Sequence, residues 1–453
     1  MKKSNLWAAF ALMVAMTTAG CSKDDETTSG VQQPDAETPS VTPTVPDEPQ
    51  KPNLEDYQLT RSEQGMVNQG NDFAFNLFRE VTAEYGLTSP RGCIPPADYD
   101  QKTATGNNIL SPISIIYALG MLNNGAAGET QQQINKVLGF ADTGTEGINT
   151  FCQKMLVKAL YSDPDTKLNI ANNIYFNSSL GYSLNPAFTQ LAKEYYEAEP
   201  ELRDFHDGKT MNVINQWCSD HTERMIEKVL DEDSFRPNAV SYLLNAIYFK
   251  GDWRSKFEET DTQEEAFTLS NNQQRQVPMM HQRSSFPYME DDLCQCVKLA
   301  YGNGTYAMTV FLPREGVKIA DVLETLTATS WMQLNARMDE TTVDLKIPRF
   351  NVETDIDLIG IMSRLGMPKA FTELAEFPNF CDGNTFIGLM KQSAKIKVNE
   401  SGTQAAAVTV IEITESAMPA EEVVSFCATR PFLYVINDQT TGAILFIGQY
   451  MGE

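Results

Sequence analysis

Apolar residues recur at helical spacing through the first half of the chain and at strand spacing through the second half. The helical pattern predicts helices at about 66–84, 145–161, 184–199 and 209–230, a short helix ending at Gly139, and one strand at 168–176. After residue 240 the pattern predicts a helix at about 355–365 and strands at 241–249, 276–280, 295–301, 306–312, 343–347, 394–399, 403–413, 423–426, 432–437 and 443–450. Helices first and strands later indicate an α+β protein.

The longest uninterrupted strand signal lies in residues 403–413. Side chains on a strand alternate between its two faces. One face would carry small or apolar residues throughout: Thr403, Ala405, Ala407, Thr409, Ile411 and Ile413. The opposite face would carry Gln404, Ala406, Val408, Val410 and Glu412. Residues 415–422 are polar, short-chained and broken by Pro419, which predicts an exposed loop. A buried strand followed by a surface loop is the simplest interpretation.

A second informative stretch is Asn108-Ile-Leu-Ser-Pro-Ile-Ser-Ile-Ile, which predicts a strand that runs into a helix. Ser111 is a suitable helix cap, and Pro112 suits the first helical turn because its missing N–H has no partner there. The preceding stretch, with Pro90, Gly92 and Pro95, predicts a long loop to which we assign no role.

The N-terminus has the pattern of a targeting segment. Lys2 and Lys3 precede an apolar run that is too short to span a bilayer. The following Ala19-Gly20-Cys21 resembles the lipobox of bacterial lipoproteins, although Thr18 stands where leucine is commoner. We therefore expect a signal peptide over 1–20, a lipid on Cys21, a Pro- and Thr-rich disordered tether over 21–56, and a folded domain over 57–453. Plain secretion with cleavage nearby is the alternative.

The acidic run 22–26 directly follows Cys21. It resembles the surface-export signal of some Gram-negative lipoproteins, and a solvated start of the tether is an equal alternative. We expect a lipoprotein of the cell envelope, in the outer membrane and exposed at the surface or extracellular. The chain would then touch the membrane through its lipid alone.

Composition and charge exclude several functions. The formal net charge of −25 disfavours binding to phosphate backbones, so we expect no nucleic-acid partner. The three histidines, His206, His221 and His281, fall in no hydrolase, zinc-protease or P-loop motif, so we expect no enzyme, no cofactor and no metal. Apart from Cys21, seven cysteines are scattered. They indicate neither a disulfide framework nor a zinc site, although Cys294 and Cys296 share one strand face.

Several motifs in order resemble the serpins, the serine protease inhibitors that act by loop insertion. The resemblance covers residues 66–452. Its motifs are Asn108-Ile-Leu-Ser-Pro-Ile-Ser-Ile, Asn245-Ala-Ile-Tyr-Phe-Lys-Gly-Asp-Trp-Arg-Ser-Lys-Phe257, Val277-Pro-Met-Met280, Phe311-Leu-Pro313, Leu345-Lys-Ile-Pro-Arg-Phe350, Glu400-Ser-Gly-Thr-Gln-Ala-Ala-Ala, Arg430-Pro-Phe-Leu-Tyr434 and Gly442-Ala-Ile-Leu-Phe-Ile-Gly448. The resemblance implies the serpin fold: a helical N-terminal half, a large central mixed sheet, smaller sheets and an exposed reactive-centre loop.

The resemblance also implies roles for individual residues. The loop hinge would comprise Glu400, Gly402, Thr403, Ala405, Ala406 and Ala407. A polar cluster under the centre of the sheet would comprise Ser111, Ser114, Asn245 and Gln392, and Trp253 would lie where the loop first enters the sheet. Three positions depart from the family pattern: Gln392 replaces a common histidine, Gln404 an acid, and Thr429 an Asn, Asp or Gln. An amide still donates and accepts hydrogen bonds, so the cluster can survive.

The implied mechanism is suicide inhibition. A serine protease attacks the loop and forms an acyl-enzyme, and the cut loop inserts into the sheet before water releases the enzyme. Family spacing places the scissile bond at Ser416–Ala417, with Glu415–Ser416 as a rival, while counting back from Pro431 gives Ala420. These residues suit a shallow, elastase-type pocket, so we expect an elastase-like serine protease as the covalent partner of a monomer. Papain-like cysteine proteases, or a non-inhibitory surface lipoprotein that uses the fold as a binding scaffold, are the alternatives.

Overall fold

The computed structural model describes residues 52–85, 106–403 and 423–452. The described residues from Leu54 onward belong to one compact unit. The α-helices of the described residues are α1 (Arg61–Tyr85), α2 (Pro112–Gly125), α3 (Gly128–Leu138), α4 (Thr145–Tyr161), α5 (Pro186–Tyr196), α6 (Thr210–His221), α7 (Ile319–Thr325), α8 (Ala328–Ala336) and α9 (Ile359–Leu365). Single 3-10 turns are η1 (Leu54–Tyr57), η3 (Ser178–Leu180), η4 (Glu259–Asp261) and η5 (Pro368–Phe371).

The described strands form two sheets. Their bounds are β1 (Asn108–Leu110), β2 (Lys167–Asn177), β3 (Glu201–Arg203), β4 (Ser241–Asp252), β5 (Gln263–Thr268), β6 (Gln274–Glu290), β7 (Cys294–Ala300), β8 (Tyr306–Pro313), β9 (Asp339–Pro348), β10 (Phe350–Asp357), β11 (Leu389–Asn399), β12 (Gly402–Thr403), β13 (Val424–Cys427), β14 (Phe432–Asp438) and β15 (Ile444–Tyr450). One sheet has the order β1-β15-β14-β8-β7-β6-β9-β13, with β5 paired to β6, and the other has the order β10-β11-β12-β4-β2-β3. Helices and mixed sheets together confirm the α+β class.

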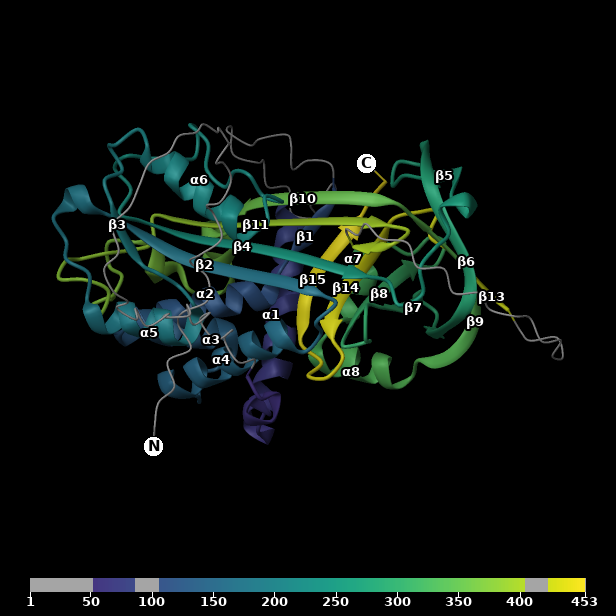
Figure 1. Ribbon diagram of the computed structural model, residues 1–453, viewed down its shortest axis with the longest axis horizontal. Helices are drawn as coiled ribbons and strands as arrows, with labels where there is room; N and C mark the ends of the chain where they lie inside the picture. Colours follow the sequence, from purple (N-terminus) through teal and green to yellow (C-terminus); the bar gives the residue numbers. More distant parts are fainter. Residues whose placement is uncertain (1–51, 86–105, 404–422, 453) are drawn as a thin grey trace, which may run out of the picture. The chain divides into compact units, whose positions relative to one another are not determined.

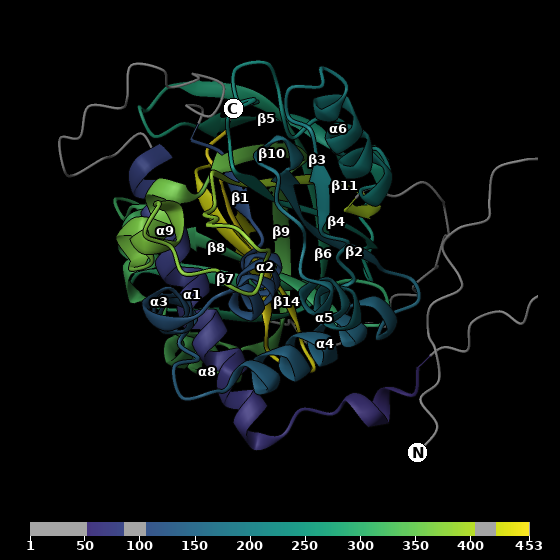
Figure 2. The same cartoon turned by 90° about the vertical axis from the view of Figure 1, so that its left-hand side faces the viewer.

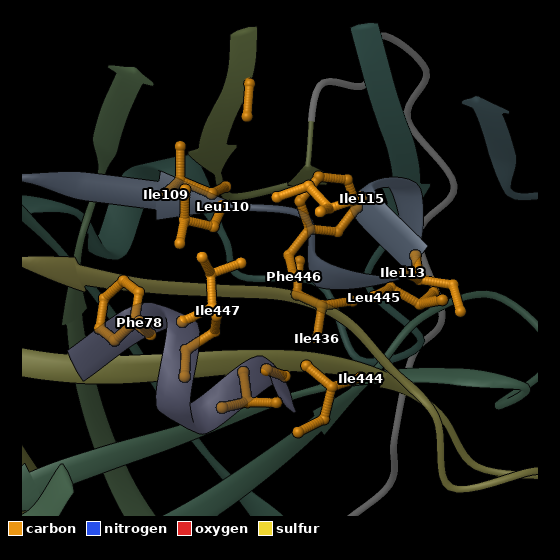
Figure 3. Packing of buried hydrophobic residues seen from close by; sticks show 14 of the residues in the cluster. Phe78, Ile109, Leu110, Ile113, Ile115, Ile436, Ile444, Leu445, Phe446 and Ile447 are labelled. Atoms are coloured by element: carbon orange, nitrogen blue, oxygen red, sulfur yellow. The ribbon is translucent and has the colours of Figure 1, made fainter. Parts of the chain in front are cut away.

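The six-stranded sheet lies between two layers of helix. In Figure 1 its long strands cross the middle of the unit, with α6 on one side and α2, α4 and α5 on the other, and Figure 2 shows the same layers from the side. The larger buried core lies on the α2 side and continues to β14 and β15. Figure 3 shows it where β1, α2 and β15 meet, around Ile109, Ile115, Phe446 and Ile447. A smaller core under α6 contains Tyr175, Ile214 and Leu244.

Two predicted helices are shorter in the structure than the sequence pattern indicated. The helix expected over 209–230 ends at His221 because Glu223 and Arg224 adopt left-handed backbone angles, with φ of 48° and 63°. The helix expected over 184–199 ends at Tyr196, where Glu197 has φ 52°. Neither end carries the glycine that normally marks a left-handed helix end, so the sequence held no signal for them.

One predicted helix is partly a strand. Residues 350–357 form β10, and the helix expected from 355 begins only at Ile359. Alternate residues of β10 are buried: Phe350, Val352, Thr354 and Ile356. That period of two is visible in the sequence and indicates a strand. The sequence pattern also missed the strands β3 and β5 and the short helices α7 and α8.

Candidate functional site

The candidate site is the seam between β4 and β11 in the six-stranded sheet. These two strands run parallel and pair directly over seven positions, from Tyr242 with Leu389 to Tyr248 with Lys395. Parallel neighbours cannot be joined by a tight turn and pair slightly less stably per residue than antiparallel ones. The other pairings between two long strands, β10 with β11 and β2 with β4, are antiparallel, and the three-residue β3 pairs parallel with β2. The seam is therefore the weakest long pairing in the six-stranded sheet.

Two hinge residues already occupy one end of this seam. Gly402 and Thr403 form β12, which pairs antiparallel with β4 on one side and with β11 on the other. Gly402 has φ 147°, and a side chain there would overlap the carbonyl oxygen of Gly251. Only glycine combines this backbone angle with so close an approach. Gly402 and Thr403 therefore form the start of a strand between β4 and β11.

Two stacked aromatic residues, Trp253 and Tyr301, lie at the end of the seam that β12 occupies. The rings of Trp253 and Tyr301 stack with centroids 4.3 Å apart, and the indole N–H of Trp253 donates to the carbonyl oxygen of Asn399 at 2.9 Å. The Tyr301 and Thr403 hydroxyl oxygens lie 2.8 Å apart. Burial raises the pKa of Tyr301, so its phenol stays protonated and can donate. Trp253 therefore lies beside the hinge residues, and Tyr301 is a partner that the sequence did not reveal.

The first hinge residue, Glu400, carries a buried carboxylate. Its Oε1 accepts a hydrogen bond from the Thr262 hydroxyl at 2.7 Å and pairs with the guanidinium of Arg349. Burial alone would raise the pKa of Glu400, but these two donors more than offset burial and hold the pKa below its ordinary value. The carboxylate thus fixes the turn that leads from β11 into β12. Its partner Thr262 directly precedes β5, and its partner Arg349 lies between β9 and β10.

The four residues assigned to a polar cluster do meet beneath the seam. The Gln392 side chain accepts from the Ser111 backbone N–H and donates to the Ser111 carbonyl oxygen, both at 2.9 Å, and it also donates to Asn245 Oδ1 at 2.6 Å. Asn245 donates to Ser114, and to Asn172 Oδ1 at 2.5 Å. Gln392 on β11 and Asn245 on β4 are register partners across the seam. Their side chains therefore tie the two strands to each other and to α2.

One expectation about this cluster was wrong. Ser111 precedes α2, but its side chain makes no capping hydrogen bond. Its hydroxyl instead donates to the carbonyl oxygen of Leu445 on β15 at 2.8 Å. A hydroxyl that is fully buried between two sheets satisfies its hydrogen bond there rather than at the helix end. Asn172 on β2, which the sequence reading did not assign, completes the cluster.

The other face of the seam is covered by the chain that follows α6. Val229 and Leu230 of this connection pack in the smaller core with Leu244 of β4 and Leu389 of β11. The ammonium of Lys391, on β11, donates to the carbonyl oxygen of Val229 at 2.9 Å. Asn215 of α6 holds the same connection through three hydrogen bonds to Val229 and Leu230. Opening the seam on this face would break the contact between Lys391 and Val229.

Several assigned residues lie outside the described part of the chain. They are the hinge residues Ala405, Ala406 and Ala407, the scissile-bond residues Glu415, Ser416 and Ala417, and the lipid-anchor residue Cys21. Within the described residues, no helix is long and apolar enough to cross a membrane. The same residues bring together no group of three or more His, Cys, Asp or Glu side chains that could hold a metal.

Comparisons with known proteins match most of this chain. The family model of the serpins (serine protease inhibitors) matches residues 97–452. Human Serpin B4 is 31% identical over 371 residues, which cover 77% of this chain and 94% of Serpin B4. A serpin-like protein of Thermococcus kodakarensis is 30% identical over 393 residues. The match covers 86% of this chain and 86% of that protein.

Solved structures match over a similar range. The thermophilic serpin tengpin in its native state aligns with TM-score 0.75 and 28% identity, covering 87% of this chain and 95% of tengpin. Human thyroxine-binding globulin, solved with thyroxine, aligns with TM-score 0.75 and 26% identity, covering 86% of this chain and 100% of the globulin. Likeness of this extent supports protease inhibition in general. Sequence, fold and comparisons together place this chain in the serpin family.

Proposed function

We propose that this protein inhibits serine proteases by inserting its cut loop between β4 and β11. The observation that carries the proposal is that Gly402 and Thr403 already pair with both strands at one end of the seam. A strand that continues from Thr403 needs only to displace the direct pairing of β4 with β11. It would replace one parallel ladder by two antiparallel ladders, which are the more stable kind.

The register of β12 fixes where each further loop residue would lie. Thr403 pairs with Gly251 of β4 and Val398 of β11. Because the new strand runs antiparallel to both neighbours, Glu412, nine residues on, would lie opposite Tyr242 and Leu389, the last pair of the seam. Thus the segment that the sequence predicts to be a strand, 403–413, has the length of the seam. At about 3.3 Å per residue, it would span roughly 36 Å.

In the same register, the alternating side chains of the inserted loop would face neighbours of matching polarity. Thr403 faces the larger core through Tyr301, so Ala405, Ala407, Ile411 and Ile413 would face that core too. On the same face, Thr409 would lie opposite Asn245 and Gln392. The one polar residue at mid-strand would thus meet the polar cluster, whose hydrogen bonds it can join. Small and apolar residues would fill the other core-facing positions.

Trapping also requires an order of events. The protease serine attacks the carbonyl carbon of the scissile residue, the peptide bond breaks, and the new amine leaves with the C-terminal segment. Insertion would then carry the acylated residue to the far end of the seam before water attacks. The uncut protein must therefore be kinetically trapped short of its most stable form. The direct pairing of β4 with β11 and the bond from Lys391 to Val229 are two barriers suited to this role.

For the target, we infer an elastase-like serine protease that cuts at Ser416–Ala417, with Glu415–Ser416 as the rival bond. Neither bond offers Arg, Lys or an aromatic residue, which trypsin-like and chymotrypsin-like pockets require. We also propose that Cys21 carries a lipid and that the inhibitor acts at the bacterial cell surface, tethered by residues 21–56, as a monomer. The Ala19-Gly20-Cys21 motif and the acidic run 22–26 support this location.

The decisive experiment incubates residues 57–453 with neutrophil or pancreatic elastase. We expect a band that survives denaturation, at the summed mass of the two proteins less that of the released peptide, which begins at Ala417. A catalytically dead elastase, with its serine replaced by alanine, is the control and should give no such band. Cleavage without a covalent band, by elastase and by papain-like proteases alike, would contradict the proposal.

The rival function is a surface-bound scaffold, which thyroxine-binding globulin, solved with its small ligand, illustrates within the same fold. Heating separates the two functions without knowledge of the target. An inserting loop should raise the melting temperature strongly once a non-target protease has cut it. A scaffold that does not insert should melt at the same temperature before and after the cut.

A further inference from the structure

Cys294 and Cys296 form a pair of thiols that the proposed inhibition does not use. Both lie on β7, two residues apart and therefore on the same strand face. Both side chains are buried, and their sulfur atoms are 3.6 Å apart. The pair belongs to the nine-stranded sheet, whereas the seam belongs to the six-stranded one. Whatever the thiols do is therefore testable apart from inhibition.

The strand holds these sulfurs at a spacing that disfavours a disulfide. Residues i and i+2 of an extended strand have Cα atoms about 6.6–6.8 Å apart. A disulfide accepts at most about 6.8 Å between its Cα atoms and usually needs about 5.5–6 Å. β7 cannot shorten easily, because Cys294 pairs with Pro313, and Cys296 pairs with Phe311 on one side and Met289 on the other. Closing to a sulfur–sulfur bond would require both ladders to yield.

The same spacing suits two bonds to one metal ion. With metal–sulfur bonds of about 2.3 Å, two thiolates on one ion lie about 3.8 Å apart at a tetrahedral angle and about 4.0 Å apart at the trigonal angle of a three-donor site. The observed 3.6 Å is within about 0.4 Å of both values, so chelation needs only small side-chain rotations. Each thiol would lose its proton, and two metal–sulfur bonds would form. Burial raises the pKa of Cys296, so an ion must bind thiolate tightly to displace the proton.

A third sulfur donor, Met289, and a cavity through which an ion could enter lie beside the pair of thiols. Met289 is the cross-strand register partner of Cys296, and Met289 and Cys294 line the same cavity of about 190 Å³. The cavity is bounded by α7 and α8, and its lining includes the exposed side chains of Asp291 and Gln333. An ion can therefore reach Cys294 from solvent. Among the described residues no histidine or carboxylate completes a cluster of three, so the donor set is all sulfur.

We propose that Cys294, Cys296 and Met289 form a binding site for copper(I), loaded through the cavity between β7 and the helices α7 and α8. Thiolate and thioether donors select copper(I) over the harder divalent ions, and a two-thiolate set leaves a bound monovalent ion with a single net negative charge. Zinc would lack the four-donor shell that its structural sites need. Arg337 and Asp291 both line the cavity, so Arg337 offsets part of the negative charge there.

The test is an anaerobic titration of the reduced full-length chain with copper(I) in competition with a chromophoric copper(I) chelator. We expect one ion per chain that the chelator does not remove. Cys294→Ser and Cys296→Ser should each weaken binding on the order of 100-fold, and Met289→Leu roughly tenfold. Cys427→Ser, which removes a half-exposed thiol outside the cluster, is the matched control and should leave the affinity unchanged. Binding also raises the melting temperature of the loaded chain if it selects the folded state.

Three results would overturn the proposal. The chelator could take all the copper from the natural chain. The Cys294→Ser and Cys296→Ser chains could bind copper as tightly as the natural chain binds it. This result counts if the melting temperatures of the copper-free variants match that of the natural chain. The chain as isolated, digested without reduction, could yield a 294–296 disulfide, which would remove both donors. If the serine variants fail to fold, protection of Cys294 and Cys296 from alkylation by bound copper in the natural chain decides the question.

Discussion

The hydroxyl groups of Tyr301 and Thr403 lie 2.8 Å apart, at the point where β12 enters between β4 and β11. Tyr301 directly follows β7 of the nine-stranded sheet, and Thr403 belongs to β12 of the six-stranded sheet, so this hydrogen bond links the two sheets. Both side chains are buried, and neither hydroxyl can turn to solvent. The bond therefore anchors the start of any further insertion.

Removing this bond should lower the stability of the uncut protein. We expect Tyr301→Phe to cost about 1 kcal/mol, the usual net value of one hydrogen bond, and Thr403→Val about 1–3 kcal/mol because it leaves a buried phenol without a partner. Urea unfolding of both single variants and of the double variant measures the coupling. If Tyr301→Phe costs as much in the Thr403→Val background as in the natural chain, the bond contributes nothing.

The buried carboxylate of Glu400 should make stability depend on acid. Its pKa in the folded protein lies below the ordinary value of 4.5, because Arg349 and Thr262 donate to it. The stabilisation is therefore complete above about pH 4.5 and is lost as the pH falls through the folded pKa. Melting temperatures of the natural chain and Glu400→Gln, measured from pH 7 down to pH 3, should converge at the acid end. Curves that stay parallel would refute the role of this carboxylate.

How far the sequence predicts this protein depends on the kind of signal. Most of the long strands and helices followed from periodicity, and motif resemblance predicted that Ser111, Ser114, Asn245 and Gln392 lie together, as their hydrogen bonds show. The partners Tyr301, Arg349 and Thr262 came from distant segments that only the tertiary fold brings to the hinge. The ends of α5 and α6 were missed because non-glycine residues take left-handed angles there. The side chain of Ser111 was assigned a local bond, whereas packing offered it a distant one on β15.

Exchanging Gln392 for histidine should introduce a pH switch that the natural chain lacks at this position. The amide makes three hydrogen bonds, one as acceptor and two as donor, in a site that is 1% exposed. A neutral imidazole can supply one donor and one acceptor, but a protonated one loses the acceptor and is buried with a charge. The folded pKa of that histidine should therefore lie below its unfolded value of about 6.5. Stability should fall as the pH drops below about 6.5.

Melting curves of Gln392→His between pH 5 and pH 8 check this prediction. The control is Gln276→His, at an exposed position on β6, which should show no comparable loss. Equal pH dependence in the two variants would mean that the polar cluster does not keep a buried imidazole neutral.

Loosening the chain after α6 should speed insertion. Lys391→Met removes the hydrogen bond from β11 to Val229 and also the ion pair of Lys391 with Asp355 of β10, at 2.7 Å. Lys395→Met is the matched control, because Lys395 lies on the same strand face and makes an equivalent ion pair, with Glu353 of β10 at 2.7 Å, so that the two variants differ in the bond to Val229. After loop cleavage, stopped-flow tryptophan fluorescence should show faster insertion in Lys391→Met than in the other two proteins. Equal rates in all three would show that this contact does not limit insertion.

The strictest test of the proposed mechanism is Thr403→Arg. Thr403 is 1% exposed and sits between β4 and β11 with its side chain toward the larger core. An arginine there must either bury an unpaired charge, at a cost of several kcal/mol, or withdraw the hinge from the seam. The loop would still be cut, but insertion should be too slow to outrun hydrolysis of the acyl-enzyme, so the inhibitor should become a substrate. Ser401→Arg, two residues before Thr403 and outside β12, is the control and should keep inhibition. Unchanged covalent trapping by Thr403→Arg would mean that the hinge does not enter the seam, and the proposed mechanism would fall with it.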